Sequence, residues 1–379
     1  MNKPGFYFWP VGTGDSTTVV IDELTVLQID IRQMDQSEDD NNEYVAVVDV
    51  LLDRLPQLKN KPYLSAFALT HPDKDHVQGF EKLLDEALIG ELWFTPRVFR
   101  EYGEELCRDA EVFQEEAYRR VKKMIEMSGA ADPGDRVRIV GYDDLLSEQE
   151  FNGFPQEFLT VPGNPVTLID GDDRAGDFRA FIHAPFKDDS EGDRNDTSLA
   201  MQIILGDDPV KGGALLFGDL KYPTIKKIYD VSEQAGNLEN LSWRILLAPH
   251  HCSKSVMYHT EGEREVLKKD ILQRFEDSQV GDGYIVASSD KIPASNSKGD
   301  NPPHAKAKAR YEELAADDFL CTMEDCKSEE PLFFGCEQGA ILLDESSLLG
   351  AAKADAVQSA IDEARGGDEP PGEKVGFGK

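Results

Sequence analysis

The sequence predicts an α/β fold in which buried strands end in loops that carry histidine and aspartate. Apolar runs of strand length recur along the chain, as at 64–69 and 243–247. Segments with helical spacing separate several of these runs, as at 80–88 and 305–315. The two apolar runs named above each lead into a pair of histidines, although the whole chain has only seven. Strand ends that gather such side chains indicate a site built on a sheet.

Composition limits the class of protein. The chain has 379 residues, of which 40% are apolar and 30% charged, values typical of a globular protein with one large or two small domains. Its 73 acidic and 40 basic residues give a net charge of −33. Such a balance argues against a protein that grips long nucleic acid through a basic surface. Small nucleotides, a local basic channel or a basic partner protein remain compatible with it.

The cellular location is predicted from the lack of a membrane-spanning run or signal peptide and from the cysteines. No apolar run approaches the roughly 20 residues that a membrane span needs, and no signal peptide is evident, so we expect no membrane association. The five cysteines lack paired zinc-binding spacing and are interpreted as free thiols in a reducing cytoplasm. Cys252 lies beside a histidine pair, where a packing role is favoured over metal binding.

The first half of the chain is assigned as follows. Residues 5–32 read as two strands and 37–42 as an acidic loop. A helix is expected near 51–55, with its end made uncertain by Pro56, before a strand at 64–69, a helix at 80–88 and a strand at 91–94. Residues 98–129, which have helical spacing and many charges, are predicted to leave the sheet as a long helical excursion.

The second half is assigned in the same way. Residues 135–220 are expected to hold further strands, broken by polar loops at 171–176 and 188–196. A strand at 243–247, a polar loop at 288–301, a helix at 305–315 and strands within 332–343 follow. From about residue 349 the chain is rich in Ala, Glu and Gly, and 366–379 is predicted to be disordered.

The loop at 70–76, T-H-P-D-K-D-H, is the most informative segment. It follows a buried strand and places four strong metal ligands within six residues, namely His71, Asp73, Asp75 and His76. Side chains of this kind repel one another and resist burial unless a cation lies between them. The loop therefore predicts a metal site; the alternative is a solvated acidic loop.

This loop, continued to Gly79 as T-H-x-D-x-D-H-x-x-G, resembles the H-x-H-x-D-H signature of the metallo-β-lactamase superfamily. Asp73 stands where the second histidine is usual, and that variant is similar to the ComEC-like branch, which comprises the hydrolase domain of bacterial DNA-uptake channels and its free-standing relatives. Further segments occur in that family's order: V-G-T-G-D-S at 11–16, a strand ending in Asp30, N-D-T-S-L at 195–199, L-L-F-G-D at 215–219, A-P-H-H-C-S at 248–253 and N-P-P-H at 301–304. Cys252 departs from the family's usual glycine.

The resemblance implies a four-layer αββα sandwich of the metallo-β-lactamase type with its site at one edge of two paired sheets. Residues 1–348 are expected to form one hydrolase domain, with the helical excursion at about 98–130, and 349–379 an acidic, Gly-rich tail.

The resemblance also implies two divalent metal ions, zinc or manganese. His71 and Asp73 would bind one ion with help from the Asn195 loop. Asp75 and His76 would bind the other together with His250 or His251, of which His250 is preferred. Asp219 would bridge the two ions.

Supporting roles follow from the same resemblance. Asp75 would also orient the attacking water or accept its proton. His304, with two lysines nearby, either contacts a substrate phosphate as a catalytic group or is a surface histidine. Asp30 and Ser198 would support the ligands, with Asp49 as the alternative to Asp30.

The function expected from this site is that of a metal-dependent phosphodiesterase or nuclease, acting on nucleic acid or a nucleotide. Two alternatives remain open: a hydrolase of a non-nucleic ester, thioester or lactam, and a metal-binding regulatory or effector subunit of a multiprotein system, for example in defence. The expected phosphodiesterase or nuclease could also act with a protein partner.

Overall fold

The computed structural model describes residues 1–349 except 2, 39–42, 101–105, 190–192, 212, 297–300, 316–317 and 328. Most of the predicted acidic loop and all but the first residue of the predicted tail lie outside these residues. Within the described part, strands form two large sheets and two small hairpins.

The first sheet is built from both ends of the described chain. Its strand order is β21-β20-β1-β2-β3-β5-β6-β7-β8, with β4 paired to β5. Pairing is antiparallel from β21 to β3 and parallel from β3 to β8. The bounds are β1 (Gly5–Phe8), β2 (Thr17–Val20), β3 (Val26–Ile29), β4 (Gln57–Leu58), β5 (Lys61–Ala68), β6 (Leu88–Phe94), β7 (Arg136–Val140), β8 (Leu159–Thr160), β20 (Leu332–Glu337) and β21 (Ala340–Leu343).

The second sheet comes from the later half of the chain, in the order β19-β18-β15-β14-β13-β12-β9. The strands β14, β15, β18 and β19 are parallel, and β9, β12 and β13 are added antiparallel. The bounds are β9 (Pro165–Val166), β12 (Phe178–Ala184), β13 (Ala200–Leu205), β14 (Gly213–Leu216), β15 (Trp243–Leu247), β18 (Gln279–Ala287) and β19 (Phe319–Cys321). The hairpins are β10 (Leu168–Ile169) with β11 (Asp172–Asp173), and β16 (Tyr258–Glu261) with β17 (Arg264–Leu267).

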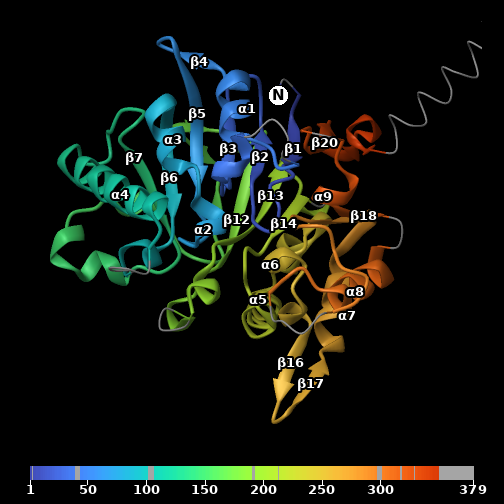
Figure 1. The fold of residues 1–379 in the computed structure, drawn as a ribbon. Helices are drawn as coiled ribbons and strands as arrows, with labels where there is room; N and C mark the ends of the chain where they lie inside the picture. Colours follow the sequence, from blue (N-terminus) through green and yellow to red (C-terminus); the bar gives the residue numbers. More distant parts are fainter. Residues whose placement is uncertain are drawn as a thin grey trace, which may run out of the picture.

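Helices cover the outer faces of the two sheets. Figure 1 shows α1 (Val47–Arg54), α3 (Phe80–Glu86) and α4 (Arg108–Glu126) beside the first sheet. The helices α5 (Tyr222–Ala235), α7 (Lys269–Ser278) and α8 (Ala305–Ala315) lie with the second sheet. Short helices occur at α2 (Lys74–Val77), α6 (Pro249–Cys252) and α9 (Thr322–Asp325). The β16–β17 hairpin extends away from the body at the bottom of Figure 1.

Three apolar layers hold these elements together. The first lies between the first sheet and α1, α3 and α4; the second lies between the two sheets; the third lies between the second sheet and α5, α7 and α8. Alternate side chains of a strand point to opposite faces, so each sheet contributes to two layers. The described chain is therefore a four-layer αββα sandwich, which confirms the predicted architecture.

Two element assignments need correction. Residues 5–32 form three strands rather than two, because Asp22 accepts hydrogen bonds from the backbone N–H of Leu24 (2.9 Å) and Thr25 (2.8 Å) and so makes a tight turn between β2 and β3. The expected helix near 51–55 begins earlier, at Val47, and ends at Arg54, just before Pro56.

Within the predicted helical excursion at 98–129, the described helix α4 packs on the first sheet instead of leaving it. The helix α4 buries Phe113, Ala117, Val121 and Met124 in the first apolar layer. These residues recur every three to four positions and form one apolar stripe on an otherwise charged helix. The many charges of this segment led to the expectation of an exposed helix. The apolar stripe instead packs α4 against the first sheet.

The described residues contain no helix long and apolar enough to cross a membrane. All five cysteines are free, as expected. Cys252 is fully buried in the third apolar layer, and burial raises the pKa of its thiol.

His183 in β12 has a structural position. It is 3% exposed, and its Nε2 donates to the carbonyl oxygen of Asn240 at 2.8 Å. Burial lowers the pKa of His183 to about 4 from its usual 6.5.

Acid should therefore destabilise the protein through His183. Between pH 6.5 and pH 4 the unfolded chain holds a proton on this ring that the folded protein lacks, so the free energy of unfolding decreases as pH falls. The decrease reaches about 3 kcal/mol for a shift of this size. Denaturant unfolding at pH 4.5 and 6.5 should show a smaller difference for His183→Gln than for the exposed-site control His259→Gln. Equal differences in the two variants would contradict this account.

Candidate metal centre

The candidate centre lies where the carboxyl ends of parallel strands from both sheets meet. Asp30 follows β3, and the loop at 70–76 follows β5, its parallel neighbour. Asp219 follows β14, and the pair His250 and His251 follows β15, again its parallel neighbour. Strands that share a direction end at the same edge, which is why loops far apart in sequence come together there.

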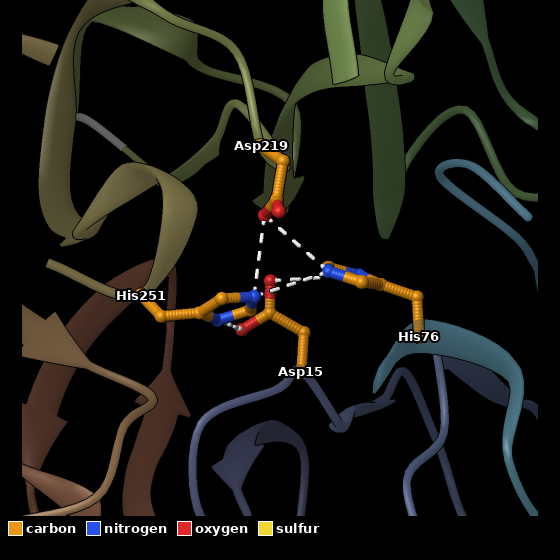
Figure 2. A group of neighbouring side chains, drawn as sticks. All are labelled: Asp15, His76, Asp219 and His251. Carbon is orange, nitrogen blue, oxygen red and sulfur yellow. Dashed lines mark hydrogen bonds and ion pairs between the residues drawn. The ribbon is translucent and has the colours of Figure 1, made fainter. Parts of the chain in front are cut away.

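Four buried side chains form the core of the site: Asp15, His76, Asp219 and His251 (Figure 2). One ligand atom from each lies within 4.8 Å of the others. Asp219 Oδ1 is 3.3 Å from His76 Nε2 and 3.4 Å from His251 Nε2, and the two Nε2 atoms are 3.2 Å apart. These three atoms form a nearly equilateral triangle.

The hydrogen bonds on the far sides of the two rings leave lone pairs inside that triangle. Nδ1 of His76 is 2.7 Å from Asp30 Oδ2, and Nδ1 of His251 is 3.2 Å from the carbonyl oxygen of Ser288. Carboxylate and carbonyl oxygens accept, so each Nδ1 donates, and in the neutral ring Nε2 then carries the lone pair. The point equidistant from these three atoms lies about 2 Å from each, the length of a Zn–N or Zn–O bond, and a cation there would displace any proton on Nε2.

The other oxygen of Asp219 faces a second group. Oδ2 is 3.6 Å from His250 Nε2 and 3.8 Å from His71 Nε2, and Asn195 Nδ2 lies 3.4 Å away. His71 Nε2 is also 3.5 Å from Asp73 Oδ2. The carboxylate of Asp219 therefore stands between two sets of imidazoles, one at each oxygen.

The residues present fit divalent cations. His71 Nε2 and Asp219 Oδ1 are buried polar atoms without a hydrogen-bond partner in the described part of the chain. Such orphaned atoms are costly unless another group satisfies them. Imidazole nitrogen and carboxylate oxygen are the donors that zinc and manganese accept.

Electrostatics point the same way. Burial alone would lower the pKa of His251, but the carboxylates of Asp219 and Asp15 outweigh burial and raise it to about 10. The imidazoles of His251 and His76 overcome burial in turn and hold the pKa of Asp219 well below its usual value. Burial likewise opposes a charged Asp73, yet His71 and Arg194 lower its pKa to about 2. The carboxylates at this edge are therefore stabilised in their charged form by neighbouring positive charge.

Supporting contacts position the candidate ligands. Asp30, 1% exposed, accepts from the backbone N–H of Thr70 (2.7 Å) and from its hydroxyl (2.6 Å) in addition to His76. Ser198 Oγ accepts from the backbone N–H of Asp219 at 3.3 Å. Gly218 has a φ of +51°, and a side chain there would meet Ser198 Cβ at 2.9 Å, so the turn into Asp219 requires glycine. Asp49 instead pairs with Lys82 at 2.8 Å, and its side chain is 47% exposed.

The histidine pair lies on strained backbone. His250, His251 and Cys252 have φ of 51°, 52° and 63°, a left-handed conformation that costs most residues free energy. The backbone N–H of His250 donates to the carbonyl oxygen of Gly218 at 2.9 Å and ties the two loops together. This turn sends His250 to Oδ2 of Asp219 and His251 to Oδ1. His251, and not the preferred His250, belongs to the four-residue cluster.

The remaining sequence candidates are placed as follows. Asp75 Oδ2 is 3.4 Å from His251 Nε2, and its side chain is 36% exposed at the mouth of the site. His304 is only 3% exposed, so the surface alternative is wrong. Its ring Nδ1 accepts from the backbone N–H of Lys254 at 3.2 Å, and the backbone N–H of His304 donates to the carbonyl oxygen of Cys252 at 3.1 Å. His304 thus packs behind the loop that carries the histidine pair.

Asp15 received no role from the sequence, although the V-G-T-G-D-S motif contains it. Its carboxylate is 3.5 Å from His251 Nδ1 and 3.9 Å from His76 Nδ1, and in Figure 2 it lies between the two rings. Its backbone N–H donates to the carbonyl oxygen of Asp75 at 3.2 Å. The motif's place in the chain was the one sequence signal that could have pointed to Asp15. Its contact with two histidines is visible only in the structure.

We expect Asp15→Ala to weaken metal binding without abolishing it. Loss of a carboxylate that orients ligand histidines typically costs about 10- to 100-fold in metal affinity. Competition with a zinc-sensitive chelating dye measures the change, and Asp282→Ala, at an exposed position of β18, is the control. An unchanged affinity would show that Asp15 does not support the centre.

No protein-family model matches the sequence, and no curated protein matches it. Solved structures with low similarity include the metallo-beta-lactamase fold protein YhfI from Bacillus subtilis, at 13% identity over 84% of this chain and 95% of that chain, with a TM-score of 0.40. A diphosphatase from the PhnP family has 10% identity, coverage of 88% and 87%, and a TM-score of 0.38. Zn²⁺-bound PqqB from Methylobacterium extorquens has 12% identity, coverage of 82% and 85%, and a TM-score of 0.39.

These scores are too low to carry an argument about function. The fold class rests on the two sheets, their outer helices and the three apolar layers, which define a four-layer αββα sandwich. At one edge of this sandwich, the buried His/Asp cluster could hold a metal ion.

Proposed function

We propose that the protein is a phosphodiesterase with two divalent metal ions, zinc or manganese, and that it belongs to the ComEC-like branch of the metallo-β-lactamase superfamily. The observation that carries the proposal is the position of Asp219. Its two carboxylate oxygens face separate pairs of imidazoles, His76 with His251 and His71 with His250. A bridging carboxylate between two nitrogen-rich sets is the arrangement that two neighbouring cations need.

Each half has a set of candidate ligands. His71, Asp73 and His250 would hold one ion, with Asn195 beside Asp219. His76, Asp75 and His251 would hold the other. When bound, such a pair would lower the pKa of a bound water and would stabilise the charge that develops in a phosphoryl displacement.

The protein's own groups divide the remaining work. Asp75 is the most exposed carboxylate of the site, so it is placed to orient the attacking water or to accept its proton. Asp30 holds His76 in one tautomer and orientation. Ser198 fixes the backbone of Asp219, and His304 supports the strained histidine turn from behind.

The test is hydrolysis of bis(p-nitrophenyl) phosphate by the purified protein, with added manganese or zinc. Wild-type protein should turn over the diester only with metal present. His76→Ala and Asp75→Ala should reduce kcat by at least about a hundredfold, whereas the exposed-site control His259→Ala should match wild type.

Other outcomes lead to other functions. Metal binding without diester turnover, but with hydrolysis of a thioester or lactam, would favour the non-nucleic hydrolase. Metal binding without any turnover would favour a regulatory or effector subunit. Protein that binds no metal would contradict the proposal outright. The cytoplasmic location inferred from the free cysteines remains a prediction that fractionation of cells would check.

A further inference from the structure

A cavity of about 450 Å³ opens beside the candidate metal centre. Asp75 lines it at the end nearest the centre, together with its neighbour Lys74 and with Gln78. The segment after β3 forms the opposite wall and contributes Arg32 and Met34. Asp75 is therefore shared by the cavity and the candidate site.

Backbone hydrogen bonds fix Arg32 in that wall. On one side of it, the N–H of Ile31 donates to the carbonyl oxygen of His76 at 2.8 Å. On the other side, the N–H of Gln33 donates to the carbonyl oxygen of Gln78 at 2.7 Å. Arg32 is thus held against the same loop that carries the candidate ligands.

The side chain of Arg32 packs against Gly14, where any larger residue would occupy the same space. A side chain at Gly14 would collide with Arg32 Cδ, and it would meet the carbonyl oxygen of Asp75 at 2.6 Å. The N–H of the next residue, Asp15, already donates to that carbonyl oxygen. The guanidinium therefore sits between the Gly14 turn and the Asp75 end of the cavity.

The charge of Arg32 has no matching acceptor among the described residues. Its Nε and Nη1 are buried and make no hydrogen bond, and Nη2 contacts Met34 Sδ, a weak acceptor, at 3.4 Å. Buried guanidinium N–H groups without an acceptor are costly, and the planar donor array of arginine suits a phosphate or carboxylate. Lys74 is exposed on the same cavity, and no described carboxylate forms an ion pair with it.

The surroundings of this cavity are acidic. The adjoining cavity, about 390 Å³, shares Met34, Asp35 and Gln78 with it. It is lined by one lysine, Lys82, and by six carboxylates: Asp35, Glu38, Glu81, Asp85, Glu86 and Asp109. On the His250 side of the centre, a cavity of about 500 Å³ is lined by three more, Asp188, Asp189 and Asp196. A long phosphate backbone that entered either flank would meet repulsion from these groups.

We propose that Arg32 and Lys74 form an anion subsite that binds a second phosphate group of a small substrate. This inference rests on the proposed function, because the scissile diester would lie at the metal centre while the subsite holds the additional phosphate. The substrate class is a small organic phosphodiester with a further terminal phosphate, of the size of a mononucleotide derivative. The acidic flanks select against polymeric nucleic acid.

The test compares two substrates that differ by one phosphate. Thymidine 5′-(p-nitrophenyl phosphate) has a free 3′-hydroxyl, and its 3′-phosphorylated form adds the second anion. Wild-type protein should hydrolyse the 3′-phosphorylated form with a kcat/KM about tenfold higher or more, mainly through KM, the scale of one charge-assisted hydrogen bond. Arg32→Ala should remove most of that ratio, Lys74→Ala should reduce it, and Arg264→Ala, an exposed arginine on β17, should preserve it.

Binding gives a second readout at constant ionic strength. Calorimetric titration with thymidine 3′,5′-bisphosphate and with thymidine 5′-monophosphate should show a preference for the bisphosphate that Arg32→Ala loses. Thermal unfolding checks that the variants are folded. If Arg32→Ala does not fold, Lys74→Ala still tests the subsite, because Lys74 is exposed.

The outcomes separate the two proposals. Absence of hydrolysis of both esters contradicts the proposed function. Hydrolysis with no preference for the 3′-phosphate, or with a preference that survives both substitutions, overturns the subsite alone. A single-stranded oligonucleotide cleaved more efficiently than the 3′-phosphorylated ester would overturn the small-substrate assignment.

Discussion

Replacement of Asp219 by alanine is expected to empty both halves of the metal centre and to reduce phosphodiester hydrolysis by at least about a thousandfold, or ~4 kcal/mol. The reason is that Asp219 supplies an oxygen to each set of imidazoles: Oδ1 lies near His76 and His251, and Oδ2 near His71 and His250. Each of these histidines contacts only one oxygen of Asp219. Metal content by plasma mass spectrometry and kcat on bis(p-nitrophenyl) phosphate measure the two effects.

The matched control for this variant is Asp282→Ala, which removes an aspartate from an exposed position of β18. It should retain both the metal and the activity. Circular dichroism of each variant shows whether the fold is intact, since loss of activity through unfolding would carry no information. An Asp219→Ala protein that is folded and keeps its full metal content would contradict a bridging role.

Removal of the metal is expected to lower the melting temperature by at least about 5 °C. A ligand present at about a thousand times its Kd stabilises the folded state by about 4 kcal/mol, and each kcal/mol shifts the midpoint by about 2–4 °C in domains of 150–250 residues. The buried carboxylates would lose the cations that balance them, since Asp15, Asp30 and Asp219 are each no more than 5% exposed. Thermal scans with and without a chelator give the shift.

The chelator response has an internal control. Asp219→Ala, which should bind little metal, should melt at the same temperature with and without chelator. Addition of excess zinc or manganese should restore the wild-type midpoint. A wild-type protein that contains metal but shows no shift on its removal would mean that the cluster is stable without cations, and the electrostatic account would then be wrong.

The sequence was informative where a local pattern has one physical solution. The strand at 243–247 and the helix at 305–315 agree with β15 and α8 to the residue, because each is a clear apolar run or helical period with a sharp boundary. The loop at 70–76 could be proposed as a metal loop because four possible ligands within six residues of one chain segment are already close together. The failures came where charge obscured an apolar stripe, as in α4, and where a single aspartate made a turn, as at Asp22.

The sequence by itself determined the α/β class, the order of the site-forming loops and the types of side chain at the centre, because these depend on local periodicity and on residues adjacent in the chain. Only the tertiary structure decided which atoms meet. The two sheets bring Asp15 beside residues 76 and 251, and three consecutive left-handed residues turn His250 and His251 to different oxygens of Asp219. The unpaired guanidinium of Arg32 beside Asp75 also arises from backbone pairing between distant segments. Contacts of this kind depend on the packing of two sheets and on backbone angles, and no spacing along one chain encodes them.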